Sequence, residues 1–475
     1  MGFYWIAYTL EIFGGLKFPW NNLLSTLFSF IVIPYYFLLA IIIFYRREIT
    51  QKFSLLNNSF PLFLSSIAVI LENYFPQQFP AHLGHTWMHL SPYLGLAPIG
   101  GAPLFSFVSY YLIFSLIDFC LTKNKKNILL PLLTFIVFLF LNISNPLDSA
   151  KWKNQNNRTL NVRMVQGNIG NFIKISAEGG LQTSISEVYK DFYELSLKNL
   201  PKKNDLIIWP ETAYPKLLNS QNMKINESAI PETVRRVLIN SKSSLLFGGY
   251  DFAKNDTSDL PEGFMTEYNS AFFVSYDEKM DRSELKNVYH KIKLIPFGEG
   301  LPFGPLNPFL GRIIENISFF AKGSDPQSFT TKKGFNFFTI ICYETLFSSF
   351  IRNFVIQFPQ TDFIVNITND SWYGRTSEPF QHLFLAKWRP LEFQIPMLRM
   401  TNTGITSIIY PDGSESKRSQ LFEKTFQDNT LSLPDRSEIG LTCFARFGHL
   451  VWPSLCLFLS LLNYFFRTKP SRNKS

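Results

Sequence analysis

The stretch that decides the fold is Phe335-Asn-Phe-Phe-Thr-Ile-Ile-Cys-Tyr-Glu344, followed directly by Thr345-Leu-Phe-Ser-Ser-Phe-Ile351. The first part is an apolar run typical of a buried strand, and the second has the spacing of apolar residues typical of a helix. Cys342 therefore lies at a strand–helix junction, where unpaired N–H groups and the helix dipole favour a thiolate. We expect a nucleophile of lowered pKa here, although a lone buried cysteine is more often an inert apolar side chain.

Runs of both kinds alternate along residues 158–435 and predict an α/β domain large enough to bury its own core. Strands are expected at Leu160–Gln166, Asp205–Trp209, Leu245–Gly249, Asn269–Ser275, Phe335–Cys342, Phe363–Thr368 and Thr406–Tyr410. Helices are expected at Gly179–Leu200, Pro231–Ser241, Leu346–Phe358 and Pro379–Gln394.

The whole chain is too apolar for one ordinary soluble domain, because 46% of its 475 residues are hydrophobic and only 17% are charged. Apolar runs that reach or approach the length of a bilayer span are Leu23–Tyr45, Phe53–Leu71, Pro103–Leu121, Ile128–Ile143 and Leu450–Phe466. We expect residues 1–150 to form an N-terminal transmembrane helix bundle and residues 447–467 a C-terminal transmembrane helix. The α/β domain of residues 158–435 is then inserted between them.

Basic residues orient these spans. Arg46 and Arg47 follow the first span, Lys125 and Lys126 lie between the third and the fourth, and Arg467 follows the last. Because cytoplasmic loops carry the excess of Lys and Arg, these clusters are expected inside the cell and the α/β domain outside. The clusters also account for much of the net charge of +9, so no nucleic-acid partner is predicted.

Two further motifs lie where expected strands end, as Cys342 does. Glu211, in Trp209-Pro-Glu211, follows a buried run at the edge where α/β proteins build their sites, and it is a candidate general base. Lys291 and Lys293 alternate with apolar residues, so both are expected on one face of a strand, where a fixed ammonium would stabilise an oxyanion. Each residue taken singly is more often a helix cap or a solvated side chain, but together they supply base, cation and nucleophile.

These motifs together resemble the nitrilase superfamily, with its Glu-Lys-Cys triad. The matching segments are Trp209-Pro-Glu211, Pro296-Phe-Gly-Glu299 with a lysine ahead of it, Cys342-Tyr-Glu344 and Asn369-Asp-Ser-Trp-Tyr-Gly374. With Gln166-Gly-Asn168, Arg399-Met-Thr-Asn-Thr-Gly404 and an outer domain set between spans, nearly the whole chain is similar to the apolipoprotein N-acyltransferase family. The resemblance implies a nitrilase-like α/β/β/α sandwich between transmembrane helices, in the bacterial cell inner membrane and facing the periplasm.

The resemblance also implies residue roles: Glu211 as general base, Lys291 as the oxyanion-stabilising cation and Cys342 as nucleophile. Lys291 is preferred to Lys293 because the family's lysine stands eight residues before the glutamate of its Pro-Phe-Gly-Glu motif, here Glu299. Supporting roles are implied for Glu299, Tyr343 and Glu344. No metal or cofactor is implied, and the metal-like spacing of the histidines in residues 82–89 has no acidic cluster beside it in the sequence.

The implied reaction is a ping-pong acyl transfer. Cys342 takes a fatty acyl chain from a phospholipid as a thioester, and the α-amino group of the diacylglyceryl-modified cysteine of an apolipoprotein then attacks it. The alternatives are a membrane-tethered amidohydrolase, in which water resolves the thioester, and a catalytically silent membrane scaffold. The family carries further spans before the Gly2–Trp5 stretch, so this chain is expected to be shortened at that end.

Overall fold

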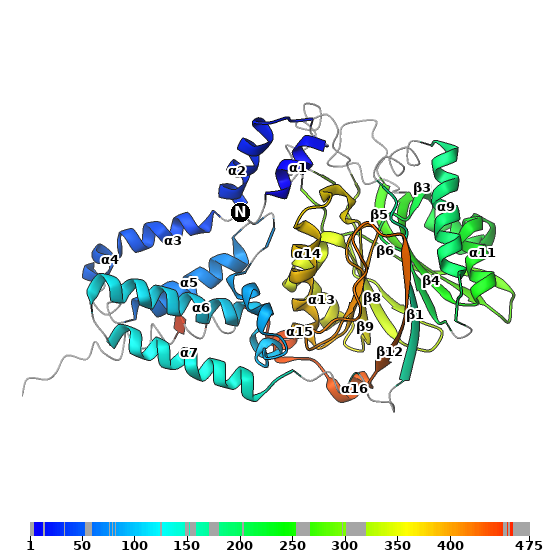
Figure 1. Cartoon of the computed structure of the whole chain (residues 1–475). Helices are drawn as coiled ribbons and strands as arrows, with labels where there is room; N and C mark the ends of the chain where they lie inside the picture. Colours follow the sequence, from blue (N-terminus) through cyan, green and yellow to red (C-terminus); the bar gives the residue numbers. More distant parts are fainter. Residues whose placement is uncertain are drawn as a thin grey trace, which may run out of the picture.

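The computed structural model describes residues 4–12, 15–32, 34–52, 59–75, 77, 79–80, 82–123, 126–147, 152, 158–170, 180–201, 204–252, 267–296, 298–300, 320–449, 454 and 457–458. An N-terminal group of helices lies beside an α/β unit (Figure 1). The N-terminal elements are α1 (Trp5–Ile12), α2 (Trp20–Val32), α3 (Tyr35–Phe44), α4 (Arg46–Lys52), α5 (Phe60–Tyr74), the 3₁₀ helix η2 (Leu83–Leu90), α6 (Ala97–Thr122) and α7 (Lys126–Ser144).

The α/β unit contains two sheets. The first has the order β12 (Thr425–Leu433), β1 (Arg158–Gln166), β2 (Leu206–Ile208), β4 (Ser244–Phe252), β5 (Glu267–Asp277) and β6 (Arg282–His290), with β3 (Tyr214–Leu218) also paired to β4. The second has the order β11 (Ser407–Ile409), β10 (Met397–Thr401), β9 (Phe363–Thr368), β8 (Asn336–Ile341) and β7 (Ser328–Thr330). Strands β1, β2 and β4 run parallel in the first sheet, as do β8, β9 and β10 in the second.

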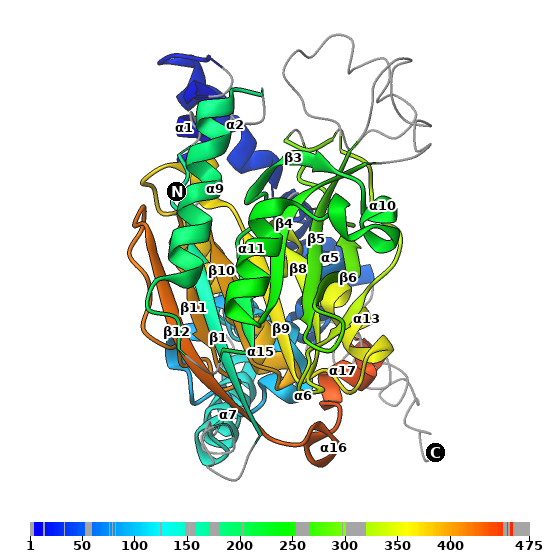
Figure 2. The ribbon, with the colours of Figure 1, turned by 90° about the vertical axis from the view of Figure 1, so that its right-hand side faces the viewer.

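Helices cover the outer face of each sheet, as Figures 1 and 2 show from two sides. The helices of this unit are α9 (Gln182–Leu197), α10 (Ser220–Ile225), α11 (Glu232–Ser241), α13 (Ser348–Gln357), α14 (Glu378–Ala386), α15 (Trp388–Phe393), α16 (Arg436–Ile439) and α17 (Cys443–Phe447), with 3₁₀ helices η4 (Glu227–Ala229), η6 (Cys342–Leu346) and η7 (Asp370–Tyr373).

Alternate side chains along the strands of the first sheet belong to two different hydrophobic cores, one on each face of the sheet. In β2, Leu206 and Ile208 join a core shared with the second sheet, whereas Ile207 joins the core beneath α9 and α11. The second sheet contributes Phe337 and Ile340 to the shared core. Alternate side chains of a strand point to opposite faces, so the observed layers are the expected α/β/β/α sandwich.

Most expected elements are present, with three corrections. The helix expected over Pro379–Gln394 is two helices, α14 and α15, separated at Lys387. The strands β3, β6, β7, β10 and β12 were not predicted, since they are short or carry polar residues on exposed positions. The prediction that Lys291 and Lys293 lie on a strand is also wrong, because β6 ends at His290.

The structure bears on the expected spans only in part. The run Leu23–Tyr45 is not one helix but α2 and α3, with Pro34 between them, because proline removes a helix N–H and clashes with the preceding turn. Among the described residues, α6 is the one helix whose length and composition suit a membrane crossing. Residues 53–58 of the second run, and nearly all of the run Leu450–Phe466, lie outside the described residues.

Helix α15 joins the α/β unit to the N-terminal helices. Trp388 belongs to the core of those helices and its Nε1 donates a hydrogen bond to the carbonyl oxygen of His85 at 3.2 Å. Glu392 accepts from the backbone N–H of Ala102 at 3.2 Å and from the Ser348 hydroxyl at 2.7 Å. Buried polar contacts of this kind fix the orientation of the two parts, so the edge of the α/β unit next to the helices is well defined.

Candidate active site

Cys342 lies directly after β8, as the sequence predicts. The residue is 4% exposed and has φ of 49°, a left-handed conformation that non-glycine residues rarely adopt. Such strain is found where surrounding structure holds a functional side chain in place. The segment that follows is a single 3₁₀ turn, Cys342–Leu346, rather than the start of an α-helix.

The expectation of a lowered thiol pKa is wrong for this structure. Burial raises the pKa of Cys342 well above its usual value, and the charge of Glu211 raises it further, while Lys291 lowers it. A short 3₁₀ turn has too few aligned peptide units for a substantial dipole, so desolvation dominates. A thiol of raised pKa requires a base to become a nucleophile.

A buried cluster of two carboxylates and one ammonium forms beside the thiol. The Nζ of Lys291 lies 2.7 Å from Glu299 Oε1 and 3.2 Å from Glu211 Oε1. Lys291 is fully buried, and the two carboxylates raise its pKa despite the opposing effect of burial. Asn269 of β5 donates to both carboxylates, at 2.8 Å to Glu211 and 3.1 Å to Glu299. Lys291 is therefore a fixed, desolvated cation.

Lys293 does not share this environment. Its side chain is exposed, whereas Lys291 is fully buried, so the two lysines do not face the same side. The chain after His290 is irregular and turns within these three residues, which breaks the strand period on which the expectation rested. The structure thus distinguishes two lysines that the strand period alone treats alike.

Glu344 forms hydrogen bonds both with the loop that follows Lys291 and with Ile341, the residue before Cys342. Its carboxylate accepts hydrogen bonds from the backbone N–H groups of Ile292 at 2.7 Å, Lys293 at 2.9 Å and Ile341 at 2.8 Å. The Tyr289 hydroxyl donates to the same group at 2.8 Å. Glu344 is fully buried, and burial raises its pKa to about 7. Glu344 positions two candidate catalytic residues without facing the cavity.

The remaining matched motifs form a network behind the site, where parallel strands of both sheets end. Asn369, after β9, donates its backbone N–H to Glu211 Oε2 at 2.8 Å. Asn402, after β10, donates to Asn369 Oδ1 at 3.0 Å and to the carbonyl oxygen of Ile169, after β1, at 2.9 Å. The carboxyl ends of the strands therefore meet, as ligand sites of α/β proteins do.

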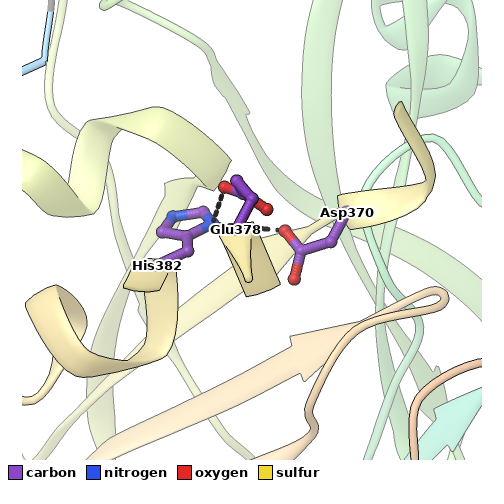
Figure 3. Close-up of side chains that lie close together, drawn as sticks. All are labelled: Asp370, Glu378 and His382. Carbon is purple, nitrogen blue, oxygen red and sulfur yellow. Dashed lines mark hydrogen bonds and ion pairs between the residues drawn. The ribbon is translucent and has the colours of Figure 1, made fainter. Parts of the chain in front are cut away.

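A second titratable cluster lies near Cys342: Asp370, Glu378 and His382 (Figure 3). His382 Nδ1 is 3.2 Å from Asp370 Oδ1 and 3.7 Å from Glu378 Oε1, and its Nε2 is 3.3 Å from the Cys342 carbonyl oxygen. The sequence predicts a helix residue at 382, and His382 indeed lies on α14. Its proximity to Cys342 was not predicted, because no spacing links the two segments.

This cluster has the ligand types of a metal site but a poor charge environment for a cation. Its candidate ligand atoms lie within 4.8 Å of one another. Asp370 is also paired with the buried guanidinium of Arg399 at 3.2 Å, and its other oxygen contacts Thr368 at 3.3 Å. Burial raises the pKa of Asp370. The neighbouring Arg399 and His382 outweigh this effect and lower the pKa to below its usual value. A bound cation would share Asp370 with a guanidinium, so we assign no metal here.

A cavity of about 480 Å³ reaches Cys342 from the side of the N-terminal helices. Its walls come from α1, the segment at residues 79–80, η2, η6, η7 and α14, and are mostly apolar and aromatic. Trp5 of α1 donates to Gln381 Oε1 at 3.1 Å, which holds the N-terminal helix against α14. Cavities of this size, with mostly apolar walls and a few polar groups, are typical of small-molecule binding sites. The thiol is therefore accessible from the part of the molecule expected to lie in the membrane.

Comparison with known proteins identifies the family of the chain. The family described as carbon-nitrogen hydrolase matches residues 161–439, and the family described as apolipoprotein N-acyltransferase N-terminal domain matches residues 1–115. The chain belongs to the apolipoprotein N-acyltransferase family of carbon–nitrogen hydrolases. The predicted family and nitrilase-like fold are thereby confirmed.

Individual relatives of this family match over most of both chains. An apolipoprotein N-acyltransferase of Bdellovibrio bacteriovorus is 28% identical over 97% of this chain and 82% of its own length. Another, of Wigglesworthia glossinidia brevipalpis, is 28% identical over 98% of this chain and 86% of its own length. A solved structure of a CN-hydrolase superfamily protein from Xanthomonas campestris covers 62% of this chain and 97% of that one, at 16% identity and a TM-score of 0.40.

Proposed function

We propose that Glu211, Lys291 and Cys342 are the catalytic residues of a phospholipid-dependent apolipoprotein N-acyltransferase. The observation that carries the proposal is the buried Glu211–Lys291–Glu299 cluster beside a thiol that lines an apolar cavity next to the N-terminal helices. Family membership makes the chain an acyltransferase, and the names of its relatives support lipoprotein maturation as its role. A soluble amidohydrolase acts on dissolved substrates and does not require a cavity that opens towards membrane helices.

In the first half-reaction, Glu211 accepts the proton of the Cys342 thiol as the sulfur attacks an ester carbonyl of the phospholipid. The carbonyl oxygen becomes an oxyanion, which Lys291 Nζ stabilises as a fixed cation in a dry site. The C–O bond then breaks, and the proton held by Glu211 passes to the leaving oxygen. Lysophospholipid departs, and Cys342 is left as a thioester.

In the second half-reaction, the α-amino group of a diacylglyceryl-cysteine attacks the thioester carbonyl. A second oxyanion forms in the same place and has the same stabilising cation. The amine loses a proton to Glu211, collapse breaks the C–S bond, and Glu211 passes that proton to the departing sulfur, which restores the thiol. The products are an N-acylated lipoprotein and free enzyme. Glu299, Asn269 and Glu344 act by holding these groups in position.

The proposed orientation places the α/β unit on the periplasmic side of the bacterial inner membrane, with several spans anchoring it. The support is the position of the basic residues after the apolar runs, together with the apolar helix α6. A membrane-impermeant thiol label on a cysteine introduced at Asn222 should react from outside in intact spheroplasts, and one introduced after Arg467 should not. The reverse pattern would contradict the orientation.

The proposed activity is tested with purified enzyme, phospholipid vesicles and a diacylglyceryl-cysteine peptide. Mass analysis should detect lysophospholipid and N-acylated peptide in equal amounts, with Cys342→Ser inactive and Glu211→Gln strongly slowed. Steady release of free fatty acid in the absence of peptide would instead support the amidohydrolase alternative. Absence of any acyl product from folded enzyme would support the silent scaffold.

A further inference from the structure

Glu378 is a buried carboxylate that the proposed mechanism does not use. It is 8% exposed and lines the same cavity as Cys342. Its Oε2 has no hydrogen-bond partner within the described part of the chain, while Oε1 faces His382 Nδ1 at 3.7 Å. A buried polar atom without a partner is costly and calls for an explanation, such as a ligand group that completes it.

Aromatic side chains line the same part of the cavity. Trp5 packs edge-on against Tyr373, with ring centroids 4.9 Å apart, and against Phe79, with centroids 5.7 Å apart. Phe79 in turn packs against Tyr343, next to the nucleophile, with centroids 5.6 Å apart. Aromatic rings around a single carboxylate are the surroundings in which proteins bind organic ammonium groups, because ring faces attract cations.

We propose that this wall is a primary-ammonium subsite, in which Glu378 Oε2 accepts a hydrogen bond from an ammonium group held among Trp5, Phe79 and Tyr373. This inference rests on the proposed function, since it assigns a binding residue to the same cavity. Two substrates would bring such a group: the acceptor, through its α-amine, and a phospholipid with an aminoethyl head group. Glu378 binds the group and forms no covalent bond with it.

The surrounding charges suit this role. Burial raises the pKa of Glu378 well above its usual value, and Asp370 raises it further, while Arg399 lowers it. A bound ammonium group favours the ionised form of Glu378, and a carboxylate whose pKa is raised can take one proton from that group, leaving a neutral amine hydrogen-bonded to the acid. Only the neutral amine has the lone pair needed to attack a thioester, so the subsite would deliver the acceptor in its reactive form.

The two sources are distinguished by measuring each half-reaction separately. Single-turnover acylation of Cys342 is followed by intact mass with vesicles of phosphatidylethanolamine or of phosphatidylglycerol, and discharge is followed by adding a diacylglyceryl-cysteine peptide. The variant is Glu378→Gln, which keeps the shape but cannot be ionised. Its control is Glu415→Gln, which removes another largely buried carboxylate that lies outside this cavity and pairs with Lys387 at 2.9 Å.

If the subsite serves the acceptor, Glu378→Gln should slow discharge by about tenfold or more while acylation from both donors stays within about twofold, since a charge-assisted hydrogen bond is lost. If it serves the head group, acylation from phosphatidylethanolamine should fall towards the phosphatidylglycerol rate and discharge should not change. Equal slowing with both donors, or no change in any step, would overturn the inference.

A binding measurement keeps this inference separate from the proposed chemistry. In the Cys342→Ser protein, decylammonium should quench Trp fluorescence at lower concentration than decanol, and Glu378→Gln in the same background should abolish that difference. Equal binding of the two probes before the Glu378 substitution would refute the ammonium subsite. Failure of acylation in the wild-type enzyme, with ammonium binding intact, would count against the proposed function alone.

Discussion

Replacing Glu344 by Gln tests whether this residue positions the site rather than taking part in the chemistry. The carboxyl group faces three backbone N–H groups and one hydroxyl, and an N–H from Ile341 reaches Oε2. The amide of Gln has one oxygen, so its NH₂ group must face at least one of these donors. An unpaired buried N–H costs about 1–3 kcal/mol. We expect the variant to be less stable than the wild type at pH 5, by up to that amount.

The raised pKa of Glu344 also makes the stability of the folded protein depend on pH, with a sign that can be worked out. Its pKa in the folded protein is raised from 4.5 to about 7. The group therefore contributes stability that is fully present below pH 4.5 and is lost as the pH rises through about 7. At 1.36 kcal/mol per unit, the shift from 4.5 to about 7 amounts to about 3 kcal/mol. Gln cannot titrate, so the variant should lack this loss, and the stability gap should narrow towards pH 8.

The assay is thermal unfolding in detergent at pH 5, 6.5 and 8, with acyl-enzyme formation measured at each pH. Glu423→Gln is the control, because Glu423 is an exposed carboxylate. The variant should also slow both half-reactions, by about tenfold for each 1.4 kcal/mol of lost positioning, because Ile341 and Ile292 adjoin Cys342 and Lys291. A stability gap that is constant from pH 5 to 8, or a variant as stable as wild type throughout, would refute the reasoning.

Two further substitutions test the proposed base and cation. Glu211→Gln cannot accept the thiol proton, so single-turnover acylation should slow by about 10²- to 10⁴-fold, and an unchanged rate would make Glu211 structural. Lys291→Met should slow both acylation and discharge by about 10²- to 10³-fold, because each passes through an oxyanion; slowing of only one half-reaction would contradict that role. In both proteins, unfolding in detergent is the check that the fold persists.

Much of this architecture follows from the sequence because it depends on local patterns. Apolar runs of strand length and helical spacings predict the central strands, and motifs at strand ends predict that Glu211 and Cys342 approach each other. Burial, by contrast, is a property of the assembled fold. The sequence gives Lys291 and Lys293 the same pattern, and it is the turn after His290 that buries one and exposes the other.

The other discrepancies have the same origin. The thiol pKa depends on desolvation and on the charge of Glu211, which outweigh the effect of a short helical turn. Asn269, which bridges Glu211 and Glu299, has no distinctive spacing from either and is identified only in three dimensions. Pro34, by contrast, is visible in the sequence and indicates that the run Leu23–Tyr45 is two helices.

The central claim is that Cys342 carries the acyl chain. The most direct measurement is the intact mass of purified enzyme after incubation with phospholipid vesicles and no acceptor, with exposed Cys443 replaced by Ser as the control. The account predicts one added acyl group in the wild type and in Cys443→Ser, its removal by hydroxylamine, and no addition in Cys342→Ser. An acyl adduct that persists in Cys342→Ser, or an acyl product formed by that variant at the wild-type rate, would contradict the account.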